Sequence, residues 1–172
     1  MAERNEAGYG IGDVAADGLP VAWCERVLPE WCDYNNHLNL AFYVLIFDHA
    51  TDVFHNSLGL GEAYRKATNN STFAVEAHVN YLSELREGAT AACTTQLLDC
   101  DGKRLHYFHR MYDAADGRLA ATTEIMVVHV DLGQRRVTPW PPAVVEAAEA
   151  VLARHRAFPR PEQQGRTIGI RR

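Results

Sequence analysis

Four hydrogen-bonding side chains stand at alternate positions ahead of an apolar segment, Leu40–Phe47: Asp33, Asn35, His37 and Asn39. A carboxylate or an imidazole can serve as a general base or a nucleophile. Asn39 is a favourable N-cap, so a helix should begin at Leu40 with unpaired, partly positive backbone N–H groups. Such a helix end can stabilise negative charge on a substrate oxygen. The alternative is that Asp33 and the asparagines only build a turn.

Size and composition narrow the class of protein. The chain has 172 residues, of which 47% are hydrophobic, which fits one domain with a sizeable core. A net charge of −5 argues against nucleic-acid binding. No apolar run reaches membrane-spanning length, and Met1–Glu6 does not resemble a secretion signal. The four cysteines have no CxxC spacing, so we expect a reduced, cytoplasmic protein.

The elements that must position these side chains can be read from periodicity. We expect a strand over 21–31, at a sheet edge because of Pro29, and a helix over 40–58 that stops at Gly59. Residues 62–70 read as a polar connection. Four strands should follow, over 73–82, 90–98, 103–112 and 118–130, the first with Phe73, Val75, Ala77, Val79 and Tyr81 on one face.

Helix and strands are segregated along the chain, which predicts an α+β fold with an antiparallel sheet and the helix across its concave face. We expect residues 1–20 to be a loose, flexible arm and 21–132 to be the functional domain. Residues 133–172 should add a second helix, from Pro141 or Pro142 to about Ala157, and a basic tail on the same domain. The tail is either solvated or a clamp for an anion such as phosphate.

The element order and the spacing of Asp33–Asn39 resemble the hotdog-fold acyl-CoA thioesterases, in which a curved antiparallel sheet wraps a long central helix. The 4-hydroxybenzoyl-CoA thioesterases of that superfamily likewise place a functional Asp just before the helix. Within the superfamily, the chain is most similar to the betainyl-CoA thioesterases of carnitine degradation. That similarity lies in Pro29–Asn35, in Glu76–His78 with Tyr81-Leu82, and in Gly165–Ile170.

The resemblance implies hydrolysis of an acyl-CoA thioester, with Asp33, Asn35 and His37 as catalytic residues. The thioester carbonyl would lie near the backbone N–H groups of Leu40 and Ala41, behind the Asn39 cap. Glu76 is a second carboxylate to test, although an exposed strand glutamate is an equally good interpretation. No metal or cofactor is implied, coenzyme A being part of the substrate, and no histidine–cysteine set has metal-ligand spacing.

A betainyl group carries a quaternary ammonium, and such cations are held over aromatic faces. Trp31 and Tyr34 flank Asp33 and are therefore the candidates for binding it. Many relatives have Gly in place of Asn36, but Asn also tolerates the left-handed backbone. The family resemblance further implies a homodimer joined edge to edge, or a tetramer of such dimers, with no nucleic-acid or membrane partner.

Two alternatives stay open. A hotdog enoyl-CoA hydratase or dehydratase usually has Asp and His five positions apart, whereas Asp33 and His37 are four apart. A non-catalytic acyl-CoA-binding protein could use the same pocket. The sequence also leaves open the acyl group, the choice between CoA and an acyl carrier protein, and whether Asp33 acts as nucleophile or base.

Overall fold

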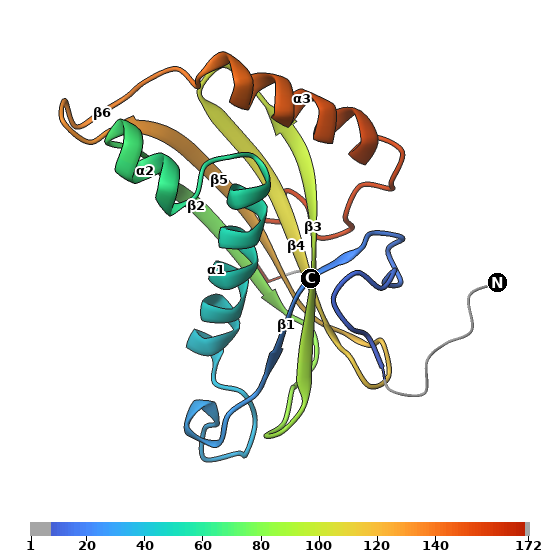
Figure 1. The fold of residues 1–172 in the computed structure, drawn as a ribbon. Coiled ribbons are helices and arrows are strands. Elements are labelled where there is room, and N and C mark those ends of the chain that lie inside the picture. The colour runs from blue at the N-terminus through green and yellow to red at the C-terminus, as the bar shows by residue number, and fades with distance from the viewer. Residues whose placement is uncertain (1–7, 171–172) are drawn as a thin grey trace.

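The computed structural model describes residues 8–170. A curved antiparallel sheet lies behind one long helix, with two further helices at its upper end (Figure 1). The elements are β1 (Val21–Arg26), a 3-10 turn η1 (Pro29–Trp31), α1 (Leu40–Ser57), α2 (Glu62–Thr68), β2 (Asn70–Tyr81), β3 (Thr90–Cys100), β4 (Arg104–Asp113), β5 (Leu119–Asp131), β6 (Arg136–Val137) and α3 (Pro142–His155). The predicted α+β fold with an antiparallel sheet is confirmed.

The sheet has the order β1-β3-β4-β5-β2, and the short β6 pairs with β5. The first strand after the helix therefore crosses to the far edge instead of pairing with its neighbour in sequence. Its register with β5 runs from Asn70 opposite Asp131 to Tyr81 opposite Ala121. Both β1 and β2 are edge strands, and β2 is the longer, with 12 residues.

Helix α1 begins and ends within one residue of the prediction. Asn39 caps it in an extended conformation, and Leu58 follows the last helical residue, with Gly59 at φ 76°. The buried side packs on the sheet through Tyr43, Ile46, Phe47, Ala50 and Phe54. Burying a side chain of this size stabilises the fold by about 1.5–3 kcal/mol, so this face fixes the helix across the sheet.

Two predicted segments differ from the structure. The strand expected over 21–31 ends at Arg26, and Pro29 opens a 3-10 turn at a position where its missing N–H costs nothing. The polar connection expected over 62–70 contains α2, which ends at Asn69 in a left-handed conformation with φ 56°. None of the helices between residues 8 and 170 is long and apolar enough to cross a membrane.

The expected alternation along β2 is interrupted by a β-bulge between Ala74 and Glu76. Phe73 and Val75 are consequently exposed, at 49% and 58%, whereas Ala74, Ala77 and Val79 face α1. A bulge adds one residue to a strand and so reverses which faces the following side chains occupy. The predicted single apolar face is therefore wrong for the first half of the strand.

Both ends of the described chain pack on the domain. Residues 8–20 do not form a loose arm: Leu19 is 1% exposed, and Asp17 pairs with Arg110 on the sheet. Helix α3 shares an apolar cluster with the end of α1, and Gly165 donates its N–H to Glu124 at 2.7 Å. Residues 1–7 of the predicted arm and 171–172 of the basic tail lie outside the described residues.

Candidate active site

The residues from Asp33 to His37 form a tight loop closed by its own backbone. The Asp33 N–H donates to the His37 carbonyl at 2.9 Å, and Asn36 has φ 59°. Asp33 Oδ1 accepts the N–H of Asn35 at 2.8 Å and that of His37 at 3.4 Å. One oxygen of the Asp33 carboxylate thus stabilises the turn, which is the role that the alternative interpretation of the sequence gave to this residue. The other, Oδ2, accepts no hydrogen bond from the described residues, 8–170.

The amino end of α1 leaves one backbone donor open. Asn39 Oδ1 accepts the Ala41 N–H at 3.0 Å, so this amide is engaged by the cap. The Leu40 N–H has no partner among the described residues, and the Leu40 side chain is 65% exposed. Of the two amides predicted to hold an oxyanion, Leu40 therefore supplies the available N–H.

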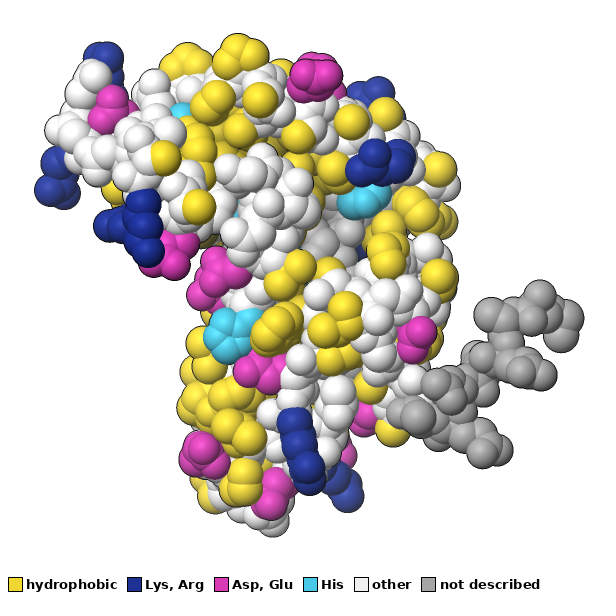
Figure 2. Space-filling model, viewed as in Figure 1, with side chains coloured by type: hydrophobic (Ala, Val, Ile, Leu, Met, Phe, Trp, Pro, Cys, Tyr) yellow, Lys and Arg dark blue, Asp and Glu magenta, His cyan; other side chains and the backbone are white. Residues whose placement is uncertain are grey.

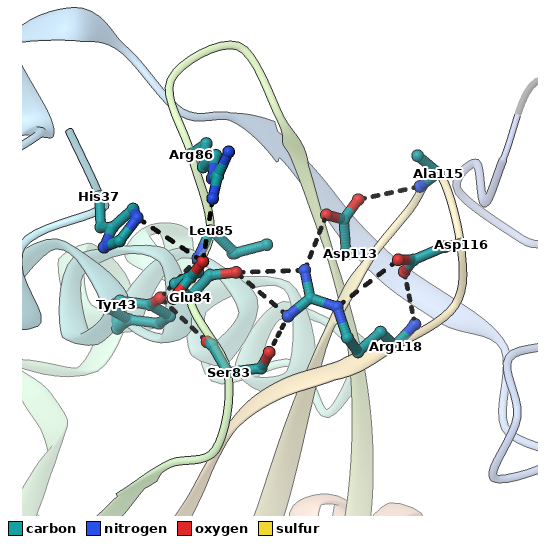
Figure 3. Close-up of polar contacts among 10 residues, drawn as sticks. All are labelled: His37, Tyr43, Ser83, Glu84, Leu85, Arg86, Asp113, Ala115, Asp116 and Arg118. Atoms are coloured by element: carbon teal, nitrogen blue, oxygen red, sulfur yellow. Dashed lines mark hydrogen bonds and ion pairs between the residues drawn. The ribbon is translucent and has the colours of Figure 1, made fainter.

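His37 lies beside a carboxylate that sequence reasoning did not identify. Its Nε2 is 3.6 Å from Glu84 Oε1, and Arg86 Nη2 approaches the same oxygen at 3.3 Å (Figure 3). The Leu38 N–H donates to the Leu85 carbonyl at 2.8 Å, so the two loops are joined through their backbones. Glu84 follows the end of β2 and reaches the site only through the fold; no local motif in the sequence marks it.

The loop that carries Glu84 is held from both sides (Figure 3). The Arg118 guanidinium donates to the Glu84 carbonyl at 3.2 Å, to Ser83 Oγ and to Asp113 Oδ2. From α1, the Tyr43 hydroxyl accepts the Leu85 N–H at 3.0 Å and donates to the Ser83 carbonyl at 3.3 Å. These contacts fix Glu84 relative to the start of α1.

The two predicted aromatic residues have different surroundings. Trp31 stacks on Phe42, with ring centroids 5.4 Å apart and 13° between planes. Tyr34 is 94% exposed and covers nothing. The Tyr81 hydroxyl donates to the Leu40 carbonyl at 3.2 Å, which brings the end of β2 to the start of α1. Tyr81 therefore contacts the residue that carries the available amide, Leu40, although the two are 41 residues apart in the chain.

Two other candidates are not brought to this loop. Glu76 is exposed in the middle of β2, opposite Met126 and beside the bulge. Cys32, adjacent to Asp33, donates its thiol to the Leu28 carbonyl at 3.6 Å, and burial raises the pKa of that thiol. A raised pKa disfavours the thiolate, so Cys32 is a poor nucleophile. No group of three His, Cys, Asp or Glu residues within 8–170 has the geometry to hold a metal ion.

Known proteins are similar to this chain in sequence and in fold. A family model described as the thioesterase-like superfamily matches residues 27–148. A betainyl-CoA thioesterase of Pseudomonas aeruginosa is 45% identical over 144 residues, which cover 84% of this chain and 91% of that protein. An L-carnitine dehydrogenase/betainyl-CoA thioesterase of Rhizobium meliloti is 34% identical over 147 residues, which cover 86% of this chain and 29% of that longer protein.

Solved structures agree. A Staphylococcus aureus protein solved in complex with CoA superposes with a TM-score of 0.83 at 31% identity, covering 89% of this chain and 97% of that one. A putative thioesterase of Pseudomonas putida KT2440 gives a TM-score of 0.78 at 32% identity, covering 90% and 98%. The resemblance to hotdog thioesterases is thereby confirmed. This chain belongs to the thioesterase-like superfamily, and its α1 is the central helix of a hotdog fold.

Proposed function

We propose that this chain hydrolyses betainyl-CoA to betaine and CoA. The observation that carries the proposal is the 45% identity with a betainyl-CoA thioesterase along nearly the whole of both chains. The geometry gives support that does not depend on this relative. Asp33 Oδ2, which has no partner among the described residues, and the open N–H of Leu40 lie on either side of one short loop. CoA enters as part of the substrate, and the reaction uses no further cofactor.

The thioester carbonyl oxygen is placed on the Leu40 N–H, where the helix end stabilises the charge of the tetrahedral intermediate. Asp33 removes a proton from water, whose oxygen adds to the carbonyl carbon. Collapse of the intermediate breaks the C–S bond and transfers that proton to the departing thiolate. A thiol with a pKa of roughly 8.5 is a tolerable leaving group without a metal. In the alternative route, the Asp33 carboxylate attacks the carbonyl carbon and releases the CoA thiolate. Water then hydrolyses the resulting anhydride and restores the carboxylate.

Asn35 and His37 are assigned to positioning the water and the substrate, and His37 is the alternative base because an imidazole nitrogen can accept the proton of the attacking water. Glu84 orients His37 from the neighbouring loop. The four cysteines are free thiols in the structure, which supports the cytoplasm as the place of the reaction.

We also propose a homodimer joined through β2. Residues Phe73–Ala77 form a run of exposed positions on this edge, and a long, apolar edge strand invites pairing. Antiparallel pairing about a two-fold axis occupies both edges at once and leaves neither free to aggregate.

The test is thiol release from a panel of betainyl-, acetyl-, hydroxybenzoyl- and long-chain CoA, with wild type and two Asp33 variants. Asp33→Asn keeps an oxygen able to accept the Asn35 amide, so the loop is retained while the negative charge is lost. We expect turnover to fall by at least about a hundredfold with an unchanged melting temperature. Asp33→Ala should lose turnover as well and also loosen the loop. Full activity of Asp33→Asn would remove the carboxylate from the mechanism.

A further inference from the structure

The C-terminal segment carries two exposed isoleucines that the proposed reaction does not use. After α3 the chain passes behind the sheet in Figure 1, on the face away from α1, which we call the outer face. Beyond Gly165, Ile168 is 96% exposed and Ile170 is 90% exposed. Residues 167–170 form no hydrogen bond within residues 8–170. Two large apolar side chains left in water forfeit the hydrophobic stabilisation that docking on an apolar surface would supply.

Gly165 anchors this segment to the sheet. Its N–H donates to Glu124 Oε2 at 2.7 Å, and the other oxygen of Glu124 lies 2.8 Å from His106 Nε2. Gly165 has φ 67°, a left-handed conformation that residues with a side chain adopt only at a cost. Thr123 and Ile125 line the cavity beside α1, so Glu124 between them points to the outer face. The segment therefore starts from a fixed point on that face.

An apolar groove of about 520 Å³ lies on the same outer face. The hollow between α1 and α2 that Figure 2 shows belongs to the other face of the sheet. Side chains of three neighbouring strands give the groove its apolar lining: Phe73, Val75, Val128, Val130 and Val137. Arg135 and Arg136 border it, whereas residues 167–170 carry no charged side chain. This part of the C-terminal segment can therefore enter the groove without bringing like charges together.

The proposed dimer brings the groove of one subunit beside the anchor of the other. A two-fold axis at the centre of β2 sets His78 opposite the partner's Phe73 and Ala77 opposite the partner's Ala74. Residues directly opposite each other in an antiparallel pair lie on the same face of the sheet. This register meets that condition. His78 pairs with Glu124 and lies on the outer face, as Phe73 does, and Ala74 and Ala77 both line the cavity beside α1.

Four residues on adjacent strands then form one row across the dimer. Glu124 on β5 pairs with His78 on β2, His78 faces the partner's Phe73, and Phe73 pairs with Val128 within its own subunit. Neighbouring strands are about 4.8 Å apart. The partner's Phe73 therefore lies roughly 10 Å from Glu124, and the partner's Val128 lies roughly 14 Å from it.

The length of the segment matches this row. An extended chain advances about 3.3 Å per residue, which places Ile168 roughly 10 Å and Ile170 roughly 16 Å beyond Gly165. The two isoleucines can thus lie over the two partner residues of the row. The groove of the same subunit is farther away, because its Phe73 is five residues along β2 from His78, about 17 Å. Ile168 cannot reach that position.

We infer that residues 166–170 of each subunit cross the two-fold axis and place Ile168 and Ile170 in the apolar groove of the partner subunit. The inference rests on the homodimer proposed above. The exchange is reciprocal, because the axis brings each segment to the groove of the other copy. It removes the isoleucines and the groove of both subunits from water, and it ties the two sheets together on their outer faces.

The first experiment measures the dissociation constant of the dimer by analytical ultracentrifugation over a dilution series. The double variant Ile168→Asp/Ile170→Asp should raise it at least about tenfold, because an apolar groove excludes unpaired charges. Ile11→Asp makes the same change at a site that is 66% exposed outside the sheet, and it should leave the constant unchanged. Wild-type affinity in the double variant overturns the inference while the proposed dimer stands. A wild-type chain that is monomeric throughout overturns both.

The second experiment compares two glycines of the segment. A Cβ added at Gly165 or at Gly169 meets no atom within 4 Å in the subunit, so neither Gly165→Ala nor Gly169→Ala creates a clash there. Only Gly165 has a left-handed backbone, so only its replacement strains the anchor and redirects the segment. Gly165→Ala should raise the dissociation constant of the dimer severalfold, and Gly169→Ala should not. Equal constants for the two variants overturn the path across the axis.

The third experiment decides which groove the segment occupies. A chain that carries both Ile168→Cys and Phe73→Cys is oxidised, and its products are separated without reductant and identified by mass spectrometry. A disulfide between subunits gives a covalent dimer, which is the expected result. A monomer with an internal disulfide between the two new cysteines, or no disulfide between them, overturns the inference. Each single variant keeps the four native thiols and should stay free of the crosslink.

Discussion

One oxygen of the Asp33 carboxylate shapes its own loop, and the other is the oxygen that the proposed mechanism uses. Oδ1 accepts two amides of its own loop, and Oδ2 stays open. The loop also requires a left-handed residue, and Asn36, at φ 59°, supplies it, as the sequence predicted. A residue that shapes the turn is thereby held in one orientation at the amino end of α1, which favours catalysis through preorganisation.

At the same scale, Glu84 is expected to act through His37. The Glu84→Gln variant keeps the size of the side chain but removes its charge, so kcat/KM should fall several-fold because the imidazole loses its fixed partner. The His37→Gln variant should fall further, and adding Glu84→Gln to it should cost little more. Steady-state kinetics on all three variants gives the coupling.

Arg86→Ala is the matched control for that cycle, because Arg86 contacts the same Glu84 oxygen at 3.3 Å from an exposed position. Its activity should stay close to wild type. Strictly additive losses for His37 and Glu84 would show that the two side chains act separately.

Among the elements, α1 depends on its cap. Replacing Asn39 with Ala frees the Ala41 amide and should lower the free energy of unfolding by about 1 kcal/mol. Asn39→Asp keeps a side-chain acceptor and should retain most of the stability. Urea denaturation of the three proteins measures the difference. Equal stability of the Ala variant would mean that the hydrogen bond at 3.0 Å contributes nothing.

The edge strand β2 offers a second test at this scale. Val75 is 58% exposed at the bulge, and Val75→Lys should disrupt pairing between two copies, because a charged edge strand resists addition of another strand. Light scattering should then report a monomer, and thiol release should fall with it. Ile11→Lys, at a site 66% exposed outside the sheet, is the control and should leave the dimer intact.

How much of each element could be predicted depends on whether its signal is local. The limits of α1 follow from Asn39 and Gly59, which act on their own neighbours, and they were predicted to within one residue. Helix α2 has only seven residues and no side-chain cap, so tertiary packing rather than propensity decides it. Glu84 enters the site because Arg118 donates to its carbonyl and Leu38 donates to the carbonyl of the next residue, Leu85, and no short sequence window contains these contacts.

For the whole molecule, buried histidines make stability depend on pH. His55 is held near a pKa of about 4 and His109 near about 3, each because burial disfavours the charged form. Unfolded histidine has a pKa of about 6.5. Below pH 6.5 these two histidines bind protons in the unfolded state but stay neutral in the folded state. The free energy of unfolding therefore falls as pH drops from about 6.5 toward 4 and 3.

Each group can contribute up to about 1.4 kcal/mol per pH unit in that window. Urea unfolding at pH 7.5, 6.0 and 5.0 should show the decline, and it should be shallower in His55→Gln. Stability that stays level between pH 7.5 and 5.0 would contradict the buried, neutral state of both rings.

The neutral His109 ring joins three elements in one line. Thr51 on α1 lies 2.9 Å from its Nε2, and Thr95 on β3 lies 2.9 Å from its Nδ1. Apolar contacts alone would let a helix rotate or slide on the sheet with small losses, whereas a buried hydrogen bond is lost at the first misalignment. The two hydrogen bonds of His109 therefore fix the rotation of α1 relative to the sheet. A Thr95→Val change on β3 should accordingly leave the position of α1 less well defined. The proposed site for the thioester and the attacking water, at the amino end of α1, should then be less precisely arranged.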